Sequence, residues 1–177
     1  MIFVSGIHGV GKTYFCNLVK EKLGIKSYSS SQLIELKQNK NFSSDKFVSD
    51  IDSNQLFLLE AINELRQSGE EFILDGHFCL LNKEGIITRI STETYSLLKP
   101  DIIILLLEIP KVIAERRFQR DGIWQNEFEI ADFQDMEKMY AMEISKNLNI
   151  PLEVSNGTSD FERILKIIKT GGYSYGR

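Results

Sequence analysis

The sequence lacks a long hydrophobic run. Its longest apolar run covers residues 102–107, far short of the roughly 18 residues that a membrane-crossing helix requires. The first five residues read directly as a buried strand, and no signal peptide precedes them. We therefore expect a soluble, cytoplasmic protein without a membrane segment.

Basic residues are not in excess either. The chain has 21 Lys and Arg against 25 Asp and Glu, which gives a formal net charge of −4. Proteins that act mainly on a nucleic-acid backbone normally carry a basic face. The charge balance therefore argues against nucleic acid as the main partner.

Cysteine and histidine are scarce, with two residues of each. Cys16 and Cys79 lack the spacing of a metal site, so we expect both to be buried thiols. The two histidines do not complete a zinc site with them.

The length suits one domain. No internal repeat is present, and 177 residues with 42% hydrophobic content are enough for a single full core. We expect one domain over residues 1–170 and a flexible tail over residues 171–177, which begins with two glycines. The tyrosines of this tail could instead dock on a partner.

Residues 6–13 read Gly-Ile-His-Gly-Val-Gly-Lys-Thr and match the phosphate-loop pattern G-x-x-x-x-G-K-[ST]. In this pattern, backbone amides face the phosphates of a nucleoside triphosphate, the lysine reaches the β and γ oxygens, and the threonine hydroxyl binds Mg²⁺. The residues that we expect to bind the triphosphate are Gly6, His8, Gly9, Val10, Gly11, Lys12, Thr13 and Tyr14.

Strands and helices alternate along the rest of the chain. Expected strands cover residues 1–5, 25–29, 71–74, 101–107 and 152–155. Expected helices cover residues 14–23, 54–68, 111–121, 130–148 and 160–168, and a further helix begins near residue 31. This alternation indicates an α/β fold with a parallel sheet between helices, whose ligands lie beyond the carboxyl ends of the strands.

Asp75-Gly76-His77 follows an expected strand directly and so lies at the ligand-binding edge of the sheet. The Asp75 carboxylate can hold a water of the Mg²⁺ ion, orient Thr13, or help to deprotonate a hydroxyl acceptor. The alternative is a turn-forming Asp-Gly pair. His77 could bind Asp75 or the substrate, or could satisfy a loop carbonyl.

Three arginines, Arg116, Arg117 and Arg120, lie at the end of the expected helix 111–121. Guanidinium groups there can neutralise the charge of a transferred phosphoryl group while a closing lid excludes water. The alternative is a solvated helix face on which the arginines pair with Glu115 and Asp121.

Several of these features occur together in one known family. The chain resembles the archaeal-type adenylate kinases and their small nucleotide-kinase relatives among the P-loop kinases. The resemblance rests on the phosphate loop, Asp75-Gly76-His77, Lys99-Pro100-Asp101-Ile102-Ile103, the arginine-rich segment, a helix around residues 133–142, and Val154-Ser155-Asn156-Gly157.

The resemblance implies a P-loop NTPase fold. The family has a five-stranded parallel sheet of order 2-3-1-4-5, which would be flanked by helices here. A short lid would cover about residues 116–130, and a monophosphate-binding region would cover about residues 30–66. The substrates would be ATP with Mg²⁺ and a small phosphoryl acceptor.

The resemblance also implies roles for individual residues. Lys12, with Arg116 or Arg120, would stabilise the transferred phosphoryl group. Arg117 would belong to the same clamp on ATP. The adenine would lie between the base of the lid and the loop that contains Asn156 and Gly157.

The acceptor region departs from the family. In the family, an arginine in this region normally binds the phosphate of the acceptor. Residues 42–50 contain no arginine. Lys46 could replace it as a point charge, whereas Asp50 would suit a hydroxyl acceptor or a helix cap. Arg89 could supply the missing contact or could be an exposed loop cation. The expected acceptor-binding residues are therefore Lys46, Asp50, His77 and Arg89.

Three functions are open at this point. The leading hypothesis is a nucleoside monophosphate kinase, adenylate-like, that transfers the γ-phosphoryl group of ATP. The second is a kinase of a hydroxyl on a nucleoside, a metabolite or a polynucleotide end, which the missing arginine favours. The third is a nucleotide-gated ATPase that acts through a protein partner.

Overall fold

The computed structural model describes residues 1–41, 51–82 and 85–171. Lys46 and Asp50, two of the predicted acceptor-binding residues, lie outside the described residues. The predicted tail also lies outside them from residue 172 onward. Every statement below concerns the described part.

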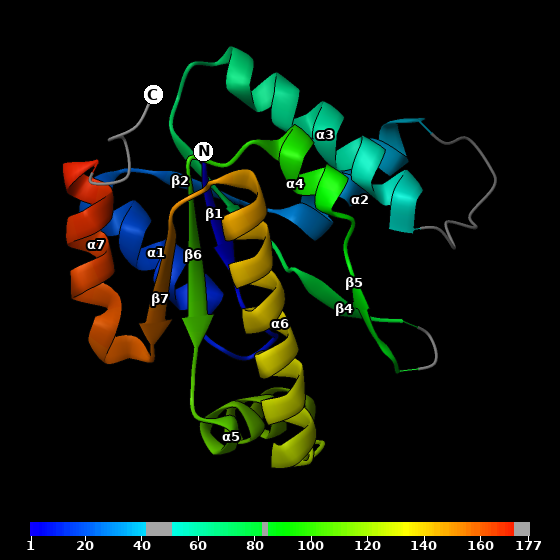
Figure 1. Cartoon of the computed structure of the whole chain (residues 1–177), viewed down its shortest axis with the longest axis vertical. Helices are drawn as coiled ribbons and strands as arrows, with labels where there is room; N and C mark the ends of the chain where they lie inside the picture. The colour runs from blue at the N-terminus through cyan, green and yellow to red at the C-terminus, as the bar shows by residue number, and fades with distance from the viewer. Residues whose placement is uncertain (42–50, 83–84, 172–177) are drawn as a thin grey trace.

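A five-stranded parallel sheet forms the centre of the molecule (Figure 1). Its order is β2-β3-β1-β6-β7, which is the predicted order 2-3-1-4-5 when only the strands of this sheet are numbered. The predicted α/β fold is thus confirmed. The strands are β1 (Ile2–Ser5), β2 (Lys26–Ser29), β3 (Phe72–Asp75), β6 (Ile102–Leu107) and β7 (Leu152–Asn156).

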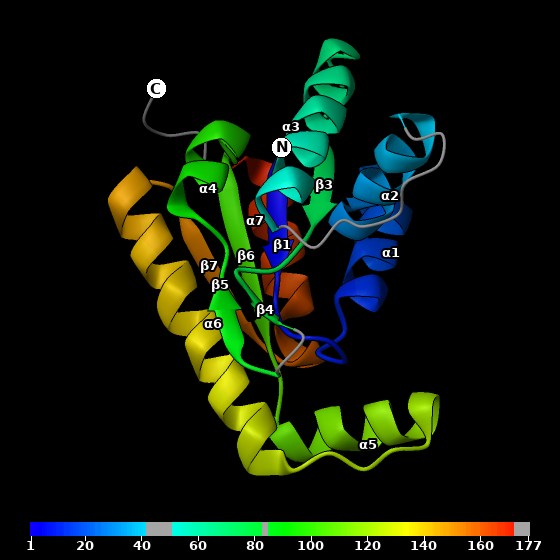
Figure 2. The same cartoon turned by 90° about the vertical axis from the view of Figure 1, so that its right-hand side faces the viewer.

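Helices cover both faces of this sheet (Figures 1 and 2). Helix α6 (Glu127–Leu148) lies against one face, whereas α1 (Lys12–Leu23) and α7 (Phe161–Thr170) lie against the other. Helices α2 (Ser30–Asn41), α3 (Ile51–Gln67) and α4 (Thr92–Leu98) pack in series beside one another. Helix α5 (Pro110–Asp121) follows β6 and contacts α6, and the 3-10 turn η1 (Thr158–Asp160) precedes α7.

The sequence analysis missed three elements between β3 and β6. Strands β4 (Cys79–Leu81) and β5 (Ile87–Arg89) form a separate antiparallel hairpin, and α4 follows it. Each strand has three residues, too few to display an alternating pattern. The start of α4 is fixed by Ser91, whose side chain accepts a hydrogen bond from the Glu93 N–H.

The core lies between the sheet and its helices. All residues of β1 are buried, and so are all residues of β6 except Leu107, because both faces of a parallel sheet are covered. From α6, the inward residues Phe133, Tyr140 and Ile144 are also buried. No helix in the described ranges is long and apolar enough to cross a membrane.

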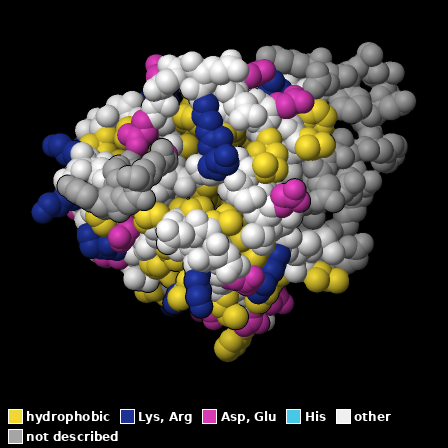
Figure 3. Space-filling view, turned by 45° about the horizontal axis from the view of Figure 1, so that its top comes forward, with side chains coloured by type: hydrophobic (Ala, Val, Ile, Leu, Met, Phe, Trp, Pro, Cys, Tyr) yellow, Lys and Arg dark blue, Asp and Glu magenta, His cyan; other side chains and the backbone are white. Residues whose placement is uncertain are grey.

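The surface carries charges of both signs. Over the face seen in Figure 3, Lys and Arg side chains are interspersed with Asp and Glu. This face shows no continuous basic stripe of the kind that a nucleic-acid backbone recruits.

Gly6 stands where the phosphate loop passes closest to the sheet. Its φ is +141°, and a Cβ at this position would lie 2.5 Å from the Leu106 carbonyl oxygen and 2.9 Å from Val10 Cγ1. Gly24 also has a positive φ, +74°, but has nothing within 4 Å of its Cβ position. Both positions have a backbone conformation that favours glycine, but only Gly6 also has neighbouring atoms where a Cβ would lie.

We predict that Gly6→Ala lowers the free energy of unfolding by about 2 kcal/mol more than Gly24→Ala, because only Gly6 adds an overlap with β6 to the strain of its backbone. Urea denaturation of both variants and the parent measures the difference. Equal losses would show that the loop moves away from Leu106 without cost.

Candidate active site

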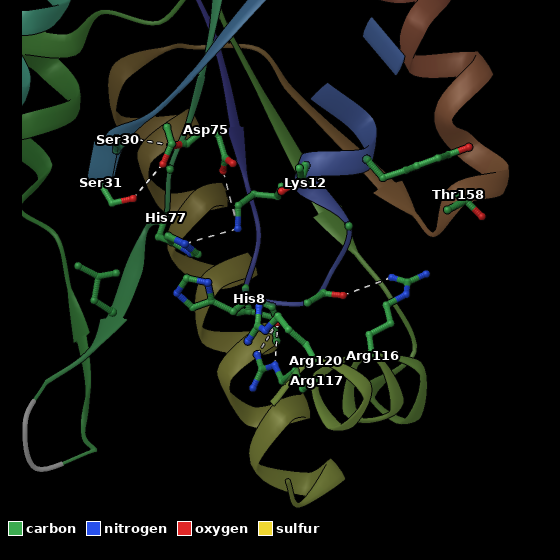
Figure 4. A pocket seen from close by; sticks show the side chains of 18 residues that line it. His8, Lys12, Ser30, Ser31, Asp75, His77, Arg116, Arg117, Arg120 and Thr158 are labelled. Atoms are coloured by element: carbon green, nitrogen blue, oxygen red, sulfur yellow. Dashed lines mark hydrogen bonds and ion pairs between the residues drawn. The ribbon is translucent and has the colours of Figure 1, made fainter. Parts of the chain in front are cut away.

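A cavity of about 780 Å³ opens at the carboxyl ends of the central strands. Figure 4 shows Lys12, Asp75 and His77 on one side of it, with His8 and three arginines of α5 on the other. The start of α2 contributes Ser30 and Ser31. The topology therefore brings together four segments that are far apart in the sequence, as the switch point of a parallel sheet does.

The phosphate loop is shaped by glycines. Gly6, Gly9 and Gly11 all have positive φ values, which let the chain turn tightly around the cavity. Gly11 is the N-cap of α1, and it provides no side chain to bond the first N–H groups of that helix. These amides, together with the helix dipole, suit the phosphates of a nucleotide.

Lys12 is 8% exposed and carries the main positive charge of the loop. Its Nζ donates a hydrogen bond to the Gly6 carbonyl at 2.5 Å and lies 3.9 Å from Asp75 Oδ1. Burial lowers the pKa of Lys12, whereas the Asp75 and Glu137 carboxylates raise it. The ammonium is thus held at the cavity wall by acceptors that favour its charged form.

Thr13 and Asp75 both line the cavity, as the predicted Mg²⁺ site requires. No cluster of three or more His, Cys, Asp or Glu side chains in the described chain could hold a metal ion by itself. This donor set fits Mg²⁺ bound to a nucleotide, because that ion takes most of its ligands from phosphates and water.

Two histidines that line the cavity are in contact, with their rings tilted relative to each other. The ring centroids of His8 and His77 are 4.5 Å apart. Burial, with the nearby charge of Lys12, lowers the pKa of His8 to about 4 and that of His77 to about 2, so both rings are uncharged at neutral pH. His77 Nε2 faces Lys12 Nζ at 3.5 Å, and its Nδ1 is buried without a hydrogen-bond partner in the described structure.

The three arginines of α5 line the cavity but differ in their contacts. Arg117 donates to the His8 carbonyl from Nε (2.8 Å) and Nη2 (2.6 Å) and also binds Gln125. Arg116 donates to the Gly9 and Val10 carbonyls at 3.3 and 3.1 Å. Arg120 pairs with the adjacent Asp121. Two arginines therefore hold the phosphate loop, whereas the third binds only its exposed neighbour among the described residues.

The Glu108 carboxylate fixes the position of the Arg116 guanidinium. Glu108, at the end of β6, pairs with Arg116 Nη2 at 3.0 Å. Gln134 of α6 bonds both the N–H and the carbonyl of Glu108, at 3.0 and 2.9 Å. A Cβ on Gly157 would lie 3.4 Å from Glu108 Oε1. Helices α5 and α6 thus share one polar network at Glu108, and Gly157 in the loop after β7 packs close to its carboxylate.

The remaining predicted residues are only partly brought to this cavity. Tyr14 lines it, is 60% exposed and lies near Phe161, with ring centroids 6.0 Å apart. Asn156 is exposed and donates its N–H to Asp160, outside the lining of this cavity. Arg89 pairs with Glu143 at 3.0 Å and lies over the Tyr140 ring, so the structure does not bring it to the cavity.

Glu137 is a site residue that the sequence analysis missed. This fully buried carboxylate accepts hydrogen bonds from the N–H groups of Phe78 (2.9 and 3.0 Å) and Cys79 (2.6 Å). It thereby fixes the chain directly after His77. Burial raises the pKa of Glu137 to about 7, although these hydrogen bonds lower it. A charged residue on the inward face of α6, among Phe133 and Tyr140, was the available signal.

We predict that Glu137 makes stability depend on pH. Because its pKa is about 7 in the folded state and the ordinary pKa of a glutamate is 4.5, its contribution is fully present below pH 4.5 and is lost as the pH rises through 7. The difference in unfolding free energy between the parent and Glu137→Gln should fall by about 3 kcal/mol between these two pH values. Denaturation at several pH values measures it.

Glu129→Gln provides the control for this measurement, because Glu129 is an exposed residue of the same helix. It should leave the pH dependence of stability unchanged. A parent and a Glu137→Gln variant with parallel pH profiles would show that Glu137 titrates normally in the folded state.

Known proteins share this architecture. The family described as AAA domain matches residues 5–128, more than half of the chain. A Methanocaldococcus jannaschii protein named "Putative adenylate kinase" is 30% identical over 122 residues, 67% of this chain but only 58% of that protein. A Thermococcus kodakarensis protein of the same name is 28% identical, with 97% of this chain and 86% of that protein aligned.

A solved structure shares the fold over nearly the whole chain. A crystal structure described as a putative kinase from Chloroflexus aurantiacus superposes with a TM-score of 0.58, covers 96% of each chain and is 17% identical. This likeness concerns the fold. The family match and the two relatives confirm the resemblance to small P-loop kinases that the sequence predicts. The chain belongs to the AAA domain family.

Proposed function

We propose that the chain is an ATP-dependent kinase that transfers the γ-phosphoryl group to a small acceptor. The observation that carries this proposal is a second cavity, of about 350 Å³, beside the phosphate-loop cavity. Ser30, Ser31, His77 and Leu80 line both. A kinase needs two adjoining sites of this kind, one for the triphosphate and one for the acceptor.

The loop residues bind and orient the triphosphate. The first amides of α1 and the Lys12 ammonium face its β- and γ-phosphates. Bound Mg²⁺ neutralises charge on these phosphates, and Thr13 with Asp75 would hold it directly or through water. Arg116 and Arg117 keep the loop in shape through its carbonyl groups. Arg120 can leave Asp121 to contact the transferred group, because both side chains are exposed.

Two acceptor classes are candidates. A nucleoside monophosphate such as AMP is suggested by the resemblance and by the two relatives named "Putative adenylate kinase". A hydroxyl compound is suggested by the second cavity, because its described wall contains no Lys or Arg. Direct transfer needs little acid–base help from the protein in either case.

We predict that Lys12→Ala lowers kcat by about 100-fold or more, because Lys12 is the buried charge that faces the transferred group. Arg120→Ala should lower kcat about tenfold or more and change the KM for ATP less. The measurement is ADP formation with Mg²⁺ across nucleoside monophosphates, nucleosides and buffer alone, with products separated by chromatography.

Lys20→Ala is the matched control, because Lys20 is an exposed lysine of the same helix, α1. Its rate should stay within about twofold of the parent. Turnover that survives Lys12→Ala would mean that this loop does not catalyse the transfer, and the proposed function would then be wrong.

A further inference from the structure

Residues of three helices, α2, α3 and α4, and of two strands, β1 and β4, line the second cavity. Phe3 of β1 lies at its base, beside Leu58 of α3 and Tyr95 of α4, and all three side chains are buried. The rings of Phe3 and Tyr95 contact edge to face, with centroids 5.6 Å apart. A wall of this kind suits an apolar ring.

Polar groups lie around this apolar base. Gln38 of α2 donates from Nε2 to Asn54 Oδ1 of α3 at 2.7 Å, and both residues line the cavity. Each amide carries donors and an acceptor beyond this single bond. These amides can orient an uncharged polar ligand through hydrogen bonds.

The wall is poor in positive charge. Glu35 is the charged residue among the described side chains that line the cavity, with no Lys or Arg beside it. Two described cations of neighbouring elements are paired with carboxylates outside the cavity lining. Lys37 pairs with Glu64 at 2.5 Å, and Arg89 pairs with Glu143. A phosphate inside this cavity would therefore meet a carboxylate without a guanidinium partner.

The described residues that line both cavities are also uncharged. His77 lines both cavities and is neutral, and its buried Nδ1 has no partner in the described structure. Ser30 and Ser31 stand at the same boundary. A hydroxyl group of an acceptor can be oriented here by neutral hydrogen bonds alone.

On the basis of the proposed kinase function, we propose that the second cavity takes an uncharged, ring-containing alcohol of nucleoside size, and not a phosphomonoester. The acceptor oxygen attacks the γ-phosphorus of ATP. The bond between this phosphorus and the β–γ bridging oxygen breaks, and ADP leaves with that oxygen. The proton of the acceptor hydroxyl passes to an oxygen of the transferred phosphoryl group, so the product is a phosphomonoester.

Matched pairs of compounds test this proposal. Adenosine and AMP, guanosine and GMP, and cytidine and CMP differ within each pair only by the phosphate. We predict that kcat/KM for the nucleoside exceeds that for its monophosphate by about tenfold or more, because the described wall of the cavity has a carboxylate and no Lys or Arg. Calorimetric binding of each compound in the presence of a non-hydrolysable ATP analogue gives a readout that does not depend on turnover.

A charge reversal makes the test specific to this wall. Glu35→Lys should reduce the preference for the nucleoside about tenfold, because it places a cation where the phosphate would enter. Glu60→Lys, at an exposed position of α3 outside the cavity lining, makes the same change in net charge and should leave the preference unchanged.

The outcomes separate the two proposals. Transfer that depends on Lys12 but prefers monophosphates would leave the kinase function intact and overturn the acceptor class. A nucleoside preference that Glu35→Lys does not reduce would also overturn it. The absence of both binding and transfer for every compound would overturn both proposals.

Discussion

The buried ammonium of Lys12 is the constraint around which the site is organised. A cation that is 8% exposed must be compensated, and the chain does this from several sides. The Gly6 carbonyl accepts its hydrogen bond, Asp75 lies 3.9 Å away, and the charge of Glu137 also favours the protonated form. Glu137 in turn bonds the N–H groups that follow His77. The Lys12 ammonium and its partners therefore fix the positions of β3, the phosphate loop and α6 relative to one another.

The three arginines of α5 have different roles because the carbonyl groups of the phosphate loop need donors. A loop that curls its amides toward a ligand turns its carbonyls outward, and these carbonyls need donors. Arg116 and Arg117 supply them at His8, Gly9 and Val10. The arginine cluster is thus not one interchangeable clamp. Arg120 pairs instead with its exposed neighbour Asp121, so in the proposed function it can contact the phosphates without releasing the loop.

The sheet and the phosphate loop could be predicted from the sequence because they depend on local pattern. The run of apolar residues in β6 and the glycine spacing of residues 6–13 are each contained within one segment. The β4–β5 hairpin was missed because three-residue strands carry no periodicity. The role of Glu137 was missed because it depends on N–H groups about 60 residues away in the chain, which only the tertiary fold brings near. The pairing of Arg89 with Glu143 could not be predicted from the sequence for the same reason.

The distribution of charge between the two cavities has a consequence for substrate selection. The phosphate-loop cavity contains Lys12 and the three arginines of α5, whereas the described wall of the second cavity has Glu35 as its charged residue. A triphosphate is therefore drawn to the loop and repelled from the acceptor side. His77 lines both cavities but is neutral, so it adds no positive charge to the second cavity. If the second cavity takes the acceptor as proposed, this asymmetry keeps ATP out of it and favours an acceptor without negative charge.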